Sequence, residues 1–334
     1  MVSKKYQGDF EAWKLFCEEL DEDYLTIDSQ KATRFLSFLW LHYKTKSGAV
    51  LSKILTGVTS SLAQVNVEWK RTRYVTNLVI AFKKLRPAKP RPKRPWSAFH
   101  IRLAYRHAVS ETLWDQACFV GMLLGWGALM RCSEFAKRHK STPILTRGQI
   151  EFSPNDKKPN EAYITLFRSK TNQFSKAEVI NVPCLCYART GIKYGGIRIK
   201  PQYCPCCATH KYVKRRDAIF GNEKARPLLL KQNAHPVNYD NMSKWMTKCV
   251  DAINDNTNLS RKLDRAHYPT HCLRCGGTTD MARSGRNGDQ IRVQGRWRTD
   301  QWKLSYLATD YRDMALLSGL TQIQLTRQTL SRNI

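Results

Sequence analysis

The C-terminal third of the chain contains the stretch HCLRCGGTTDMARSGRNGDQIRVQGRWRTDQWKLSY, which covers residues 271–306. Its first and fourth residues, His271 and Arg274, share one face if the segment is helical. The triplet Gly-Arg-Trp ends at Trp297, and Tyr306 closes the stretch. A guanidinium group can bind phosphate, a histidine can move a proton, and a tyrosine hydroxyl can act as a nucleophile. The stretch therefore predicts chemistry on a phosphate ester.

The composition indicates a polyanionic partner. The chain has 334 residues, which favours two domains, and a formal net charge of +29 at pH 7. Because such a charge opposes compaction, a polyanion explains it better than a solubilising surface or a membrane does. No apolar run is long enough to span a bilayer, and the N-terminus has no signal-peptide pattern. The 11 cysteines are therefore expected to be thiols in a reducing compartment.

Residues 1–86 are expected to form a small helical domain. Apolar side chains recur at helical spacing in four segments between Phe10 and Phe82. A segment rich in proline and basic residues follows at 87–98 and is expected to be an extended linker. The cations that we expect to lie along phosphates are Lys83, Lys84, Arg86, Lys89, Arg91, Lys93 and Arg94. A nuclear localisation signal at 89–94 and an ordinary solvated linker are the alternatives.

Residues 99–334 are expected to form a second domain of mixed structure. Helical patterns occur from about residue 108 and at 239–254, 270–284, 299–308 and 312–332, and strand-like runs at 144–152, 162–167 and 178–182. A hairpin between the last two strands carries Lys170 at its tip. The predicted fold class is mainly α, with a helical N-terminal domain and an α+β domain that contains a small three-stranded antiparallel sheet.

Cleavage of a phosphodiester by an enzyme hydroxyl needs a nucleophile, cations at the non-bridging oxygens, and an acid for the leaving oxygen. Metal-dependent nucleases supply the cations as ions held by carboxylates. The 27 acidic residues of this chain form no such cluster in the sequence. Arginines can replace the metal because they bind phosphate bidentately and stay charged.

In order and spacing these segments resemble the motifs of the tyrosine recombinase/integrase family. GALMRCSE (127–134) is similar to the first arginine box, RSKTNQ (168–173) to the mobile hairpin lysine, and HCLRCGGTT (271–279) to the His-x-x-Arg box. The resemblance covers residues 99–311 by motif and 1–85 by organisation alone.

The resemblance implies a role for each residue of the first two boxes. Arg131 would bind the scissile phosphate, and Glu134 would orient neighbouring basic groups. Lys170 would be the general acid that protonates the 5′-oxygen. Lys176 in the same hairpin is an alternative to Lys170, although its surroundings match the family less well.

The C-terminal boxes complete the implied site. Arg274 would be the second phosphate ligand, and His271 would assist proton transfer from the tyrosine or orient the phosphate. Trp297 would donate its indole N–H to a phosphate oxygen, and Tyr306 would form a 3′-phosphotyrosyl link. Tyr311 is a second candidate nucleophile, but it lies too far from Trp297 for the family's spacing. Trp302 is a poorer match than Trp297, because it lacks both the preceding glycine and the family's spacing.

The chemistry implied by the resemblance needs no cofactor, because the phosphotyrosyl link retains the energy of the phosphoester. A separate cysteine-rich insertion at 183–210 could hold a structural zinc ion. Its candidate ligands are Cys184, Cys186, Cys204 and Cys207, with Cys206 as an alternative to Cys207. The other interpretation is that the Cys204-Pro segment only starts a helix. Cys272 and Cys275 are expected to be packing residues.

Together these patterns predict a recombinase that cuts double-stranded DNA between its two domains. The tail at 313–334 is amphipathic, and the resemblance implies that it docks on a neighbouring protomer and gives dimers and a synaptic tetramer, with packing in cis as the alternative. The insertion, the Gly-Arg-Trp triplet and the basic linker resemble Crypton-type mobile-element recombinases, which implies integration or excision in a eukaryotic nucleus; otherwise the cytoplasm or nucleoid is expected. A DNA-binding regulator that has lost the chemistry and a type IB topoisomerase are the alternative functions.

Overall fold

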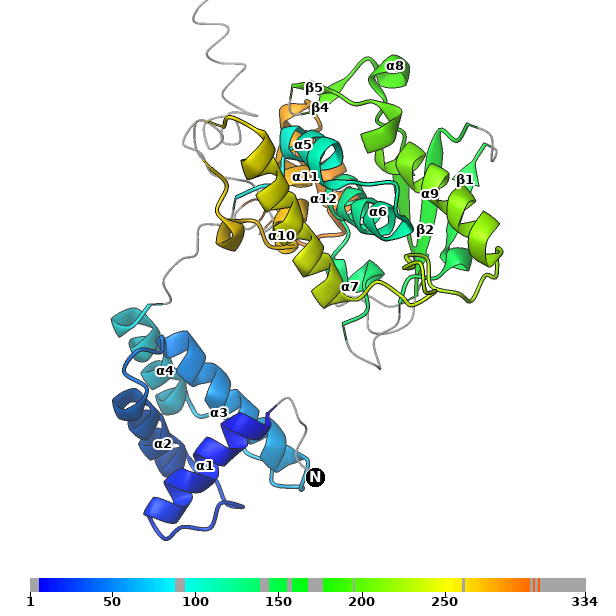
Figure 1. Cartoon of the computed structure of the whole chain (residues 1–334). Coiled ribbons are helices and arrows are strands. Elements are labelled where there is room, and N and C mark those ends of the chain that lie inside the picture. The colour runs from blue at the N-terminus through cyan, green and yellow to red at the C-terminus, as the bar shows by residue number, and fades with distance from the viewer. Residues whose placement is uncertain are drawn as a thin grey trace, which may run out of the picture. The chain divides into compact units, whose positions relative to one another are not determined.

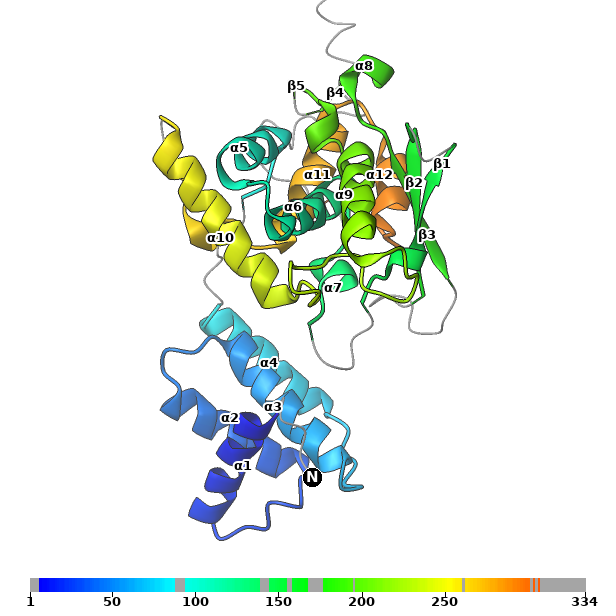
Figure 2. The same cartoon turned by 45° about the vertical axis from the view of Figure 1, so that its right-hand side comes forward.

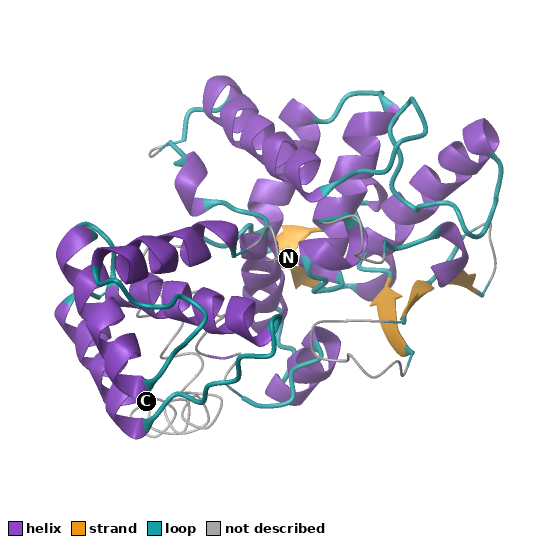
Figure 3. Ribbon diagram, turned by 90° about the horizontal axis from the view of Figure 1, so that it is seen from below, coloured by secondary structure: helices purple, strands orange, loops and turns teal. Residues whose placement is uncertain are grey.

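The computed structural model describes residues 6–87, 94–138, 144–154, 158–167, 177–194, 196–259 and 262–300, together with Lys303 and Tyr306. The chain divides into two compact units, Met1–Arg91 and Pro92–Ile334 (Figure 1). Helices predominate over strands, as Figure 3 shows. No helix among the described residues combines the length and the apolarity that crossing a bilayer requires.

The first unit is a bundle of four helices, as its apolar periodicity predicts. They are α1 (Gln7–Glu19), α2 (Ser29–His42), α3 (Gly48–Ala63) and α4 (Arg73–Leu85). The Asp28 side chain caps α2 by accepting the backbone N–H of Lys31 at 2.7 Å. Trp13 and Phe35 meet edge to face in the core, with ring centroids 4.9 Å apart. Five buried aromatic residues therefore contribute to its core: Phe10, Trp13, Phe16, Phe35 and Phe82.

The second unit begins earlier than residue 99. The Trp96 side chain is fully buried, and its indole N–H donates to the carbonyl of Tyr268 at 3.2 Å. The backbone N–H of Arg94 also donates to this unit, at the carbonyl of His267. The predicted linker is thus too long at its C-terminal end, because Trp96 is an apolar anchor inside a basic, proline-rich segment. A helix at 98–108 follows directly and was not predicted.

The sheet of the second unit confirms the predicted antiparallel arrangement. Its strands are β1 (Ile150–Ser153), β2 (Glu161–Leu166) and β3 (Glu178–Pro183), in the order β1-β2-β3. Ile164 at the centre pairs with Ile150 on one side and Ile180 on the other, and all three are buried. The first strand starts later than predicted because a 3-10 turn, η1 (Arg147–Gln149), precedes it. The fold class is therefore the one expected: mainly α, with a small three-stranded antiparallel sheet.

Helices fill the rest of the second unit. They are α5 (Ala98–Ala108), α6 (Leu113–Gly127), α7 (Cys132–Phe135), α8 (Tyr187–Thr190), α9 (Pro205–Phe220), α10 (Tyr239–Asn256), α11 (His271–Arg283) and α12 (Gly288–Gly295), with short 3-10 turns η2 (Pro201–Tyr203) and η3 (Arg265–His267). The sheet lies at one side and α10 at the opposite side, with α6 and α11 between them (Figures 1 and 2). A two-stranded hairpin, β4 (Lys193–Tyr194) and β5 (Ile197–Arg198), lies in the insertion that was expected to be irregular.

Two glycines let α11 approach its neighbours at the backbone. A Cβ atom on Gly276 would lie 1.9 Å from the carbonyl oxygen of Trp96, and one on Gly277 would lie 1.8 Å from that of Trp126. Neither oxygen can move away easily, because both belong to the backbone. The small residues after Arg274 therefore seat α11 directly against α6 and the segment before α5.

Asp280 joins three elements in the core. Its Oδ2 accepts the backbone N–H of Ala98 at 2.6 Å and the indole N–H of Trp126 at 2.9 Å. Oδ1 is buried and has no hydrogen-bond partner among the described residues. Burial raises the pKa of Asp280 to about 6, although the two N–H donors act in the opposite direction.

We expect Asp280→Asn to remove a pH-dependent loss of stability. Because the folded-state pKa is raised from 3.8, the carboxyl stabilises the fold fully below pH 3.8 and loses this contribution as pH rises through about 6. Asparagine keeps an acceptor for Ala98 and Trp126 but cannot ionise. Relative to the wild type, its free energy of unfolding should rise by up to about 3 kcal/mol between pH 4 and 7. Urea denaturation at several pH values measures this difference, and a constant difference would contradict the prediction.

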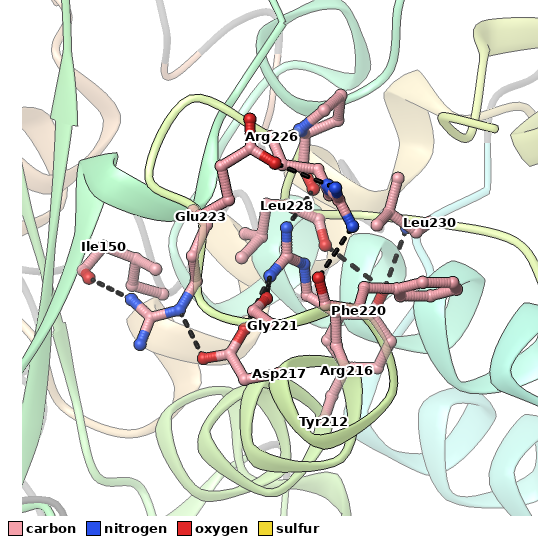
Figure 4. Close-up of polar contacts among 12 residues, drawn as sticks. Ile150, Tyr212, Arg216, Asp217, Phe220, Gly221, Glu223, Arg226, Leu228 and Leu230 are labelled. Atoms are coloured by element: carbon pink, nitrogen blue, oxygen red, sulfur yellow. Dashed lines mark hydrogen bonds and ion pairs between the residues drawn. The ribbon is translucent and has the colours of Figure 1, made fainter. Parts of the chain in front are cut away.

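A buried arginine organises the end of α9 (Figure 4). Arg216 is fully buried and donates to the Asp217 carboxylate at 2.5 Å and to the carbonyl of Pro227 at 3.0 Å. The other oxygen of Asp217 accepts from Arg147, which also donates to the carbonyl of Ile150. This network fastens the loop after α9 to the start of β1.

Candidate active site

Arg131 and Glu134 form the first part of the candidate active site, at the short helix α7. The backbone N–H of Arg131 donates to one oxygen of Glu134 at 2.7 Å, and its guanidinium donates to the other at 3.0 Å. This reciprocal arrangement holds the arginine side chain beside the helix start. Glu134 is 8% exposed, so its charge requires paired cations.

Arg296 is the second cation on Glu134 and was not singled out from the sequence. It ends α12 in the left-handed conformation, with φ at 56°. Its guanidinium donates to Glu134 at 2.7 Å and lies 3.7 Å from the carboxylate of Glu178 on β3. Burial by itself raises the pKa of Glu134, but Arg296 and Arg131 outweigh it and hold that pKa below its usual range. The carboxylate is therefore ionised between two arginines.

Arg274 lies at the centre of the arrangement. It is 1% exposed, and one terminal nitrogen donates to the carbonyl of Gly295. Its Nε and Nη1 are buried and find no hydrogen-bond partner among the described residues. Burial, and next the charge of Arg131, lower the pKa of Arg274 to about 10, so it remains protonated at neutral pH. Unpaired buried donors of this kind are costly and would be satisfied by an anion.

Two aromatic rings lie beside this guanidinium, and a third ring contacts one of them. The guanidinium carbon of Arg274 lies 4.7 Å from the ring centroid of Trp297 and 5.3 Å from that of Tyr306. The Tyr306 ring lies 4.9 Å from the Trp297 ring and 5.0 Å from the His271 ring, between centroids. His271 opens α11 and is exposed. The tyrosine hydroxyl therefore belongs to a group of side chains that contains a buried cation and an accessible imidazole.

Gly295 is required by the position of Trp297. A Cβ atom at Gly295 would lie 1.8 Å from Cζ3 of the indole, so the ring occupies the space above the glycine. The carbonyl of the same glycine accepts from Arg274. The Gly-Arg-Trp triplet thus supplies an anchor for Arg274, a cation for Glu134 and an aromatic ring beside Tyr306.

We expect Gly295→Ala to displace the indole of Trp297. Because a partly exposed ring can move outward, stability should change by less than about 1 kcal/mol. Any DNA cleavage should fall about tenfold or more, since the ring beside Tyr306 is misplaced. Gly8→Ala is the control, because a Cβ atom at Gly8 meets nothing within 4 Å. Equal cleavage rates for both variants would show that the position of Trp297 is unimportant.

The structure brings together five of the six residues predicted to be catalytic. These are Arg131, His271, Arg274, Trp297 and Tyr306. Lys170 lies outside the described residues, as do the alternatives Lys176, Trp302 and Tyr311 and the predicted tail. The fold alone assigns no catalytic role to the five residues that it brings together.

The predicted phosphate-binding cations differ in their surroundings. Lys83, Lys84 and Arg94 are exposed. Arg86 instead stacks on the ring of Trp40, 3.4 Å from its centroid, and donates to the Trp40 carbonyl at 2.9 Å. This side chain therefore holds the end of α4 to α2. Lys89, Arg91 and Lys93 lie outside the described residues.

A four-cysteine cluster lies apart from these residues. Its members are Cys184, Cys186, Cys204 and Cys207, whose sulfur atoms all lie within 4.8 Å of one another. Cys206 points elsewhere, with its sulfur 3.8 Å from the carbonyl of Pro159. Cys204 is the N-cap residue of α9, so the Cys204-Pro segment does start a helix. The cluster could hold a structural metal. Cys272 and Cys275 are buried in α11.

Comparison with known proteins identifies the fold. No family model matches the chain, and no match was found among curated proteins. Among solved structures, a XerH site-specific recombinase bound to palindromic difH substrate, in a post-cleavage complex, superposes with a TM-score of 0.54 at 10% identity. That match covers 94% of this chain and 76% of XerH.

Two further structures are similar over most of both chains. A lambda integrase dimer bound to a COC' core site has a TM-score of 0.51 at 15% identity, covering 92% of this chain and 90% of that one. The Tn1549 transposon integrase in complex with transposon right end DNA has a TM-score of 0.50 at 14% identity, covering 89% and 86%. The chain therefore has the fold of the tyrosine recombinases.

Proposed function

We propose that this protein is a tyrosine recombinase that cleaves and rejoins double-stranded DNA through Tyr306. The observation that carries the proposal is the phenol of Tyr306 beside Arg274, a buried cation with two unsatisfied N–H donors. A scissile phosphate seated there would receive these donors and those of Arg131. Such an arrangement stabilises charge on the non-bridging oxygens, as a metal ion does in other nucleases.

In the proposed reaction the Tyr306 oxygen attacks phosphorus and forms a 3′-phosphotyrosyl bond, while the bond from phosphorus to the 5′-oxygen breaks. His271 would take the phenolic proton, a role supported by the distance of 5.0 Å between the ring centroids of His271 and Tyr306. Lys170 would give a proton to the 5′-oxygen, a role that comes from the family resemblance. Attack by a 5′-hydroxyl reverses the steps, so rejoining needs no ATP and no cofactor.

The partners follow from charge and from the fold. A net charge of +29 favours a polyanion, and exposed cations such as Lys83 and Lys84 would contribute salt-dependent contacts with DNA phosphates. Because similar folds are found in a DNA-bound dimer and on the end of a transposon, we propose dimers and a synaptic tetramer on DNA and a role in mobile-element integration or excision. A Crypton-type origin and a nuclear location belong to the same proposal.

For the four-cysteine cluster we propose zinc, in a structural role. Thiolates are ligands that zinc prefers, and four of them leave no open position for a substrate.

Covalent trapping tests the proposed chemistry. The protein is incubated with duplex DNA without added divalent metal and is then denatured. The duplex carries a nick beside the cleavage site, so that the short fragment with the new 5′-hydroxyl can diffuse away. We expect a protein–DNA adduct on a gel, together with a free 5′-hydroxyl. DNA binding without any adduct would favour a regulator that has lost the chemistry, and relaxation of plasmids without recombinant products would favour a type IB topoisomerase.

A further inference from the structure

The sulfur atoms of the four-cysteine cluster are spaced as ligands of one tetrahedral ion would be. Cys207 Sγ lies 3.5 Å from Cys184 Sγ and 3.6 Å from Cys186 Sγ, and Cys204 Sγ lies 3.8 Å from Cys184 Sγ. Zinc–sulfur bonds of about 2.3 Å in a tetrahedron place ligand atoms about 3.8 Å apart. A disulfide would need a sulfur–sulfur distance of about 2.05 Å. The geometry thus fits an ion better than a disulfide.

The surrounding backbone supports thiolates at this place. The backbone N–H of Leu185 donates to Cys204 Sγ at 3.2 Å, in the way that outer hydrogen bonds orient metal ligands. The backbone N–H of Cys184 donates to the carbonyl of Asn160 at 2.7 Å and fixes the start of the first pair. Cys184, Cys186 and Cys204 are buried, as in metal sites that are closed to substrate.

The cluster joins two elements that are distant in sequence. Cys184 directly follows β3, and Cys204 directly precedes α9. These elements contact each other, and Figure 2 shows them side by side. A bound ion would therefore fasten the end of the strand to the start of the helix.

Both elements lead to the candidate active site. At the other end of β3, Glu178 lies 3.7 Å from Arg296. Within the strand, the carbonyl of Asn181 accepts from Gln294 of α12 at 2.9 Å. At the start of α9, Pro205 packs closely on Gly127: a Cβ atom on Gly127 would lie 2.1 Å from the proline ring. Gly127 ends α6, just before the segment that carries Arg131. One side of the cluster thus supports Arg296, and the other supports Arg131.

We infer that the four thiolates bind one zinc ion that positions the Arg131–Glu134–Arg296 group by fixing β3 against α9. These cysteines are positioning residues, because they act on the site through β3 and α9. The metal content of the protein can be measured without DNA. A failure to find zinc is therefore distinct from a failure of the proposed recombinase function. Only the cleavage readout rests on that function.

The first measurement is the metal content of the full-length protein, purified with a reducing agent and without a metal-affinity step. One zinc ion per chain is expected, and the Cys184→Ser/Cys207→Ser double variant should bind less than about a tenth of that amount. Cys206→Ser is the matched control, because Cys206 is adjacent to Cys207 and buried but lies outside the cluster. It should retain the ion.

The second measurement separates positioning from folding. We expect the double variant to cleave nicked DNA at least about tenfold more slowly than Cys206→Ser, with DNA affinity changed less than about threefold. If the double variant does not fold, wild-type protein stripped by a chelator and refilled with zinc gives the same comparison. Absence of zinc from the wild type even after addition of zinc, or equal loss of zinc from Cys206→Ser, would overturn the inference. Zinc binding with equal cleavage in the filled and stripped protein would overturn the positioning role.

Discussion

Tyr306→Phe is expected to abolish the covalent protein–DNA adduct and to lower DNA cleavage by a factor on the order of 10³ or more. The substitution removes only the hydroxyl that would attack phosphorus. The ring contacts with His271, Trp297 and Arg274 can all be made by phenylalanine, because they involve ring faces and edges. Folding and DNA affinity should therefore stay close to those of the wild type.

Tyr311→Phe is the matched control for this prediction, because it removes a hydroxyl only a few residues farther along the chain. It should form the adduct at the wild-type rate. Both variants are compared on the same nicked duplex under single-turnover conditions, with DNA affinity measured in parallel. An adduct that persists in Tyr306→Phe and disappears in Tyr311→Phe would reassign the nucleophile.

Local patterns were sufficient to predict the sheet and most of the helices. Alternation of apolar residues identified β2 and β3 closely, because one face of each strand is buried and the other is not. The same approach missed α5, which has a capping box closed by His100 rather than by an acid. It also extended the linker over Trp96, since the burial of this residue depends on Tyr268, far away in the sequence.

The candidate site shows the same limit. The spacing of His271 and Arg274 is a property of one helix, and the sequence places both on one face. The partnership of Arg296 with Glu134 depends on a left-handed residue at the end of α12 and on a contact between distant segments. No local pattern encodes that contact. The burial of Glu134, which only the structure shows, is what makes a second cation necessary for this acid to stay ionised.

The choice among the cysteines depends on geometry in a similar way. Cys206 and Cys207 are adjacent, so their side chains leave α9 in different directions, and only Cys207 reaches the other three sulfur atoms. The sequence left both open because the direction of each side chain depends on where α9 begins. With Cys204 as the cap of α9 and Pro205 as its first residue, Cys207 is the cysteine whose sulfur joins the cluster.

Arg274→Lys is expected to lower the rate of DNA cleavage by a factor on the order of 10³, with a much smaller effect on DNA affinity. Lysine keeps the positive charge, but it has no planar fork that can donate to Gly295 and to a phosphate at the same time. It also loses the contact of the guanidinium group with the ring of Trp297. The loss should appear mainly in the chemical step, because the two unsatisfied donors of Arg274 would be used where charge develops on the non-bridging oxygens.

Arg283→Lys is the control for this change, since Arg283 is an exposed arginine in the last turn of the same helix. Single-turnover cleavage and DNA affinity of both variants separate the chemical step from binding. Inorganic phosphate gives an independent measure, because an anion held by Arg274 should raise the melting temperature of the wild type and of Arg283→Lys but not of Arg274→Lys. Equal cleavage by the two variants would mean that charge alone is needed at position 274, and that the buried fork does not bind the scissile phosphate.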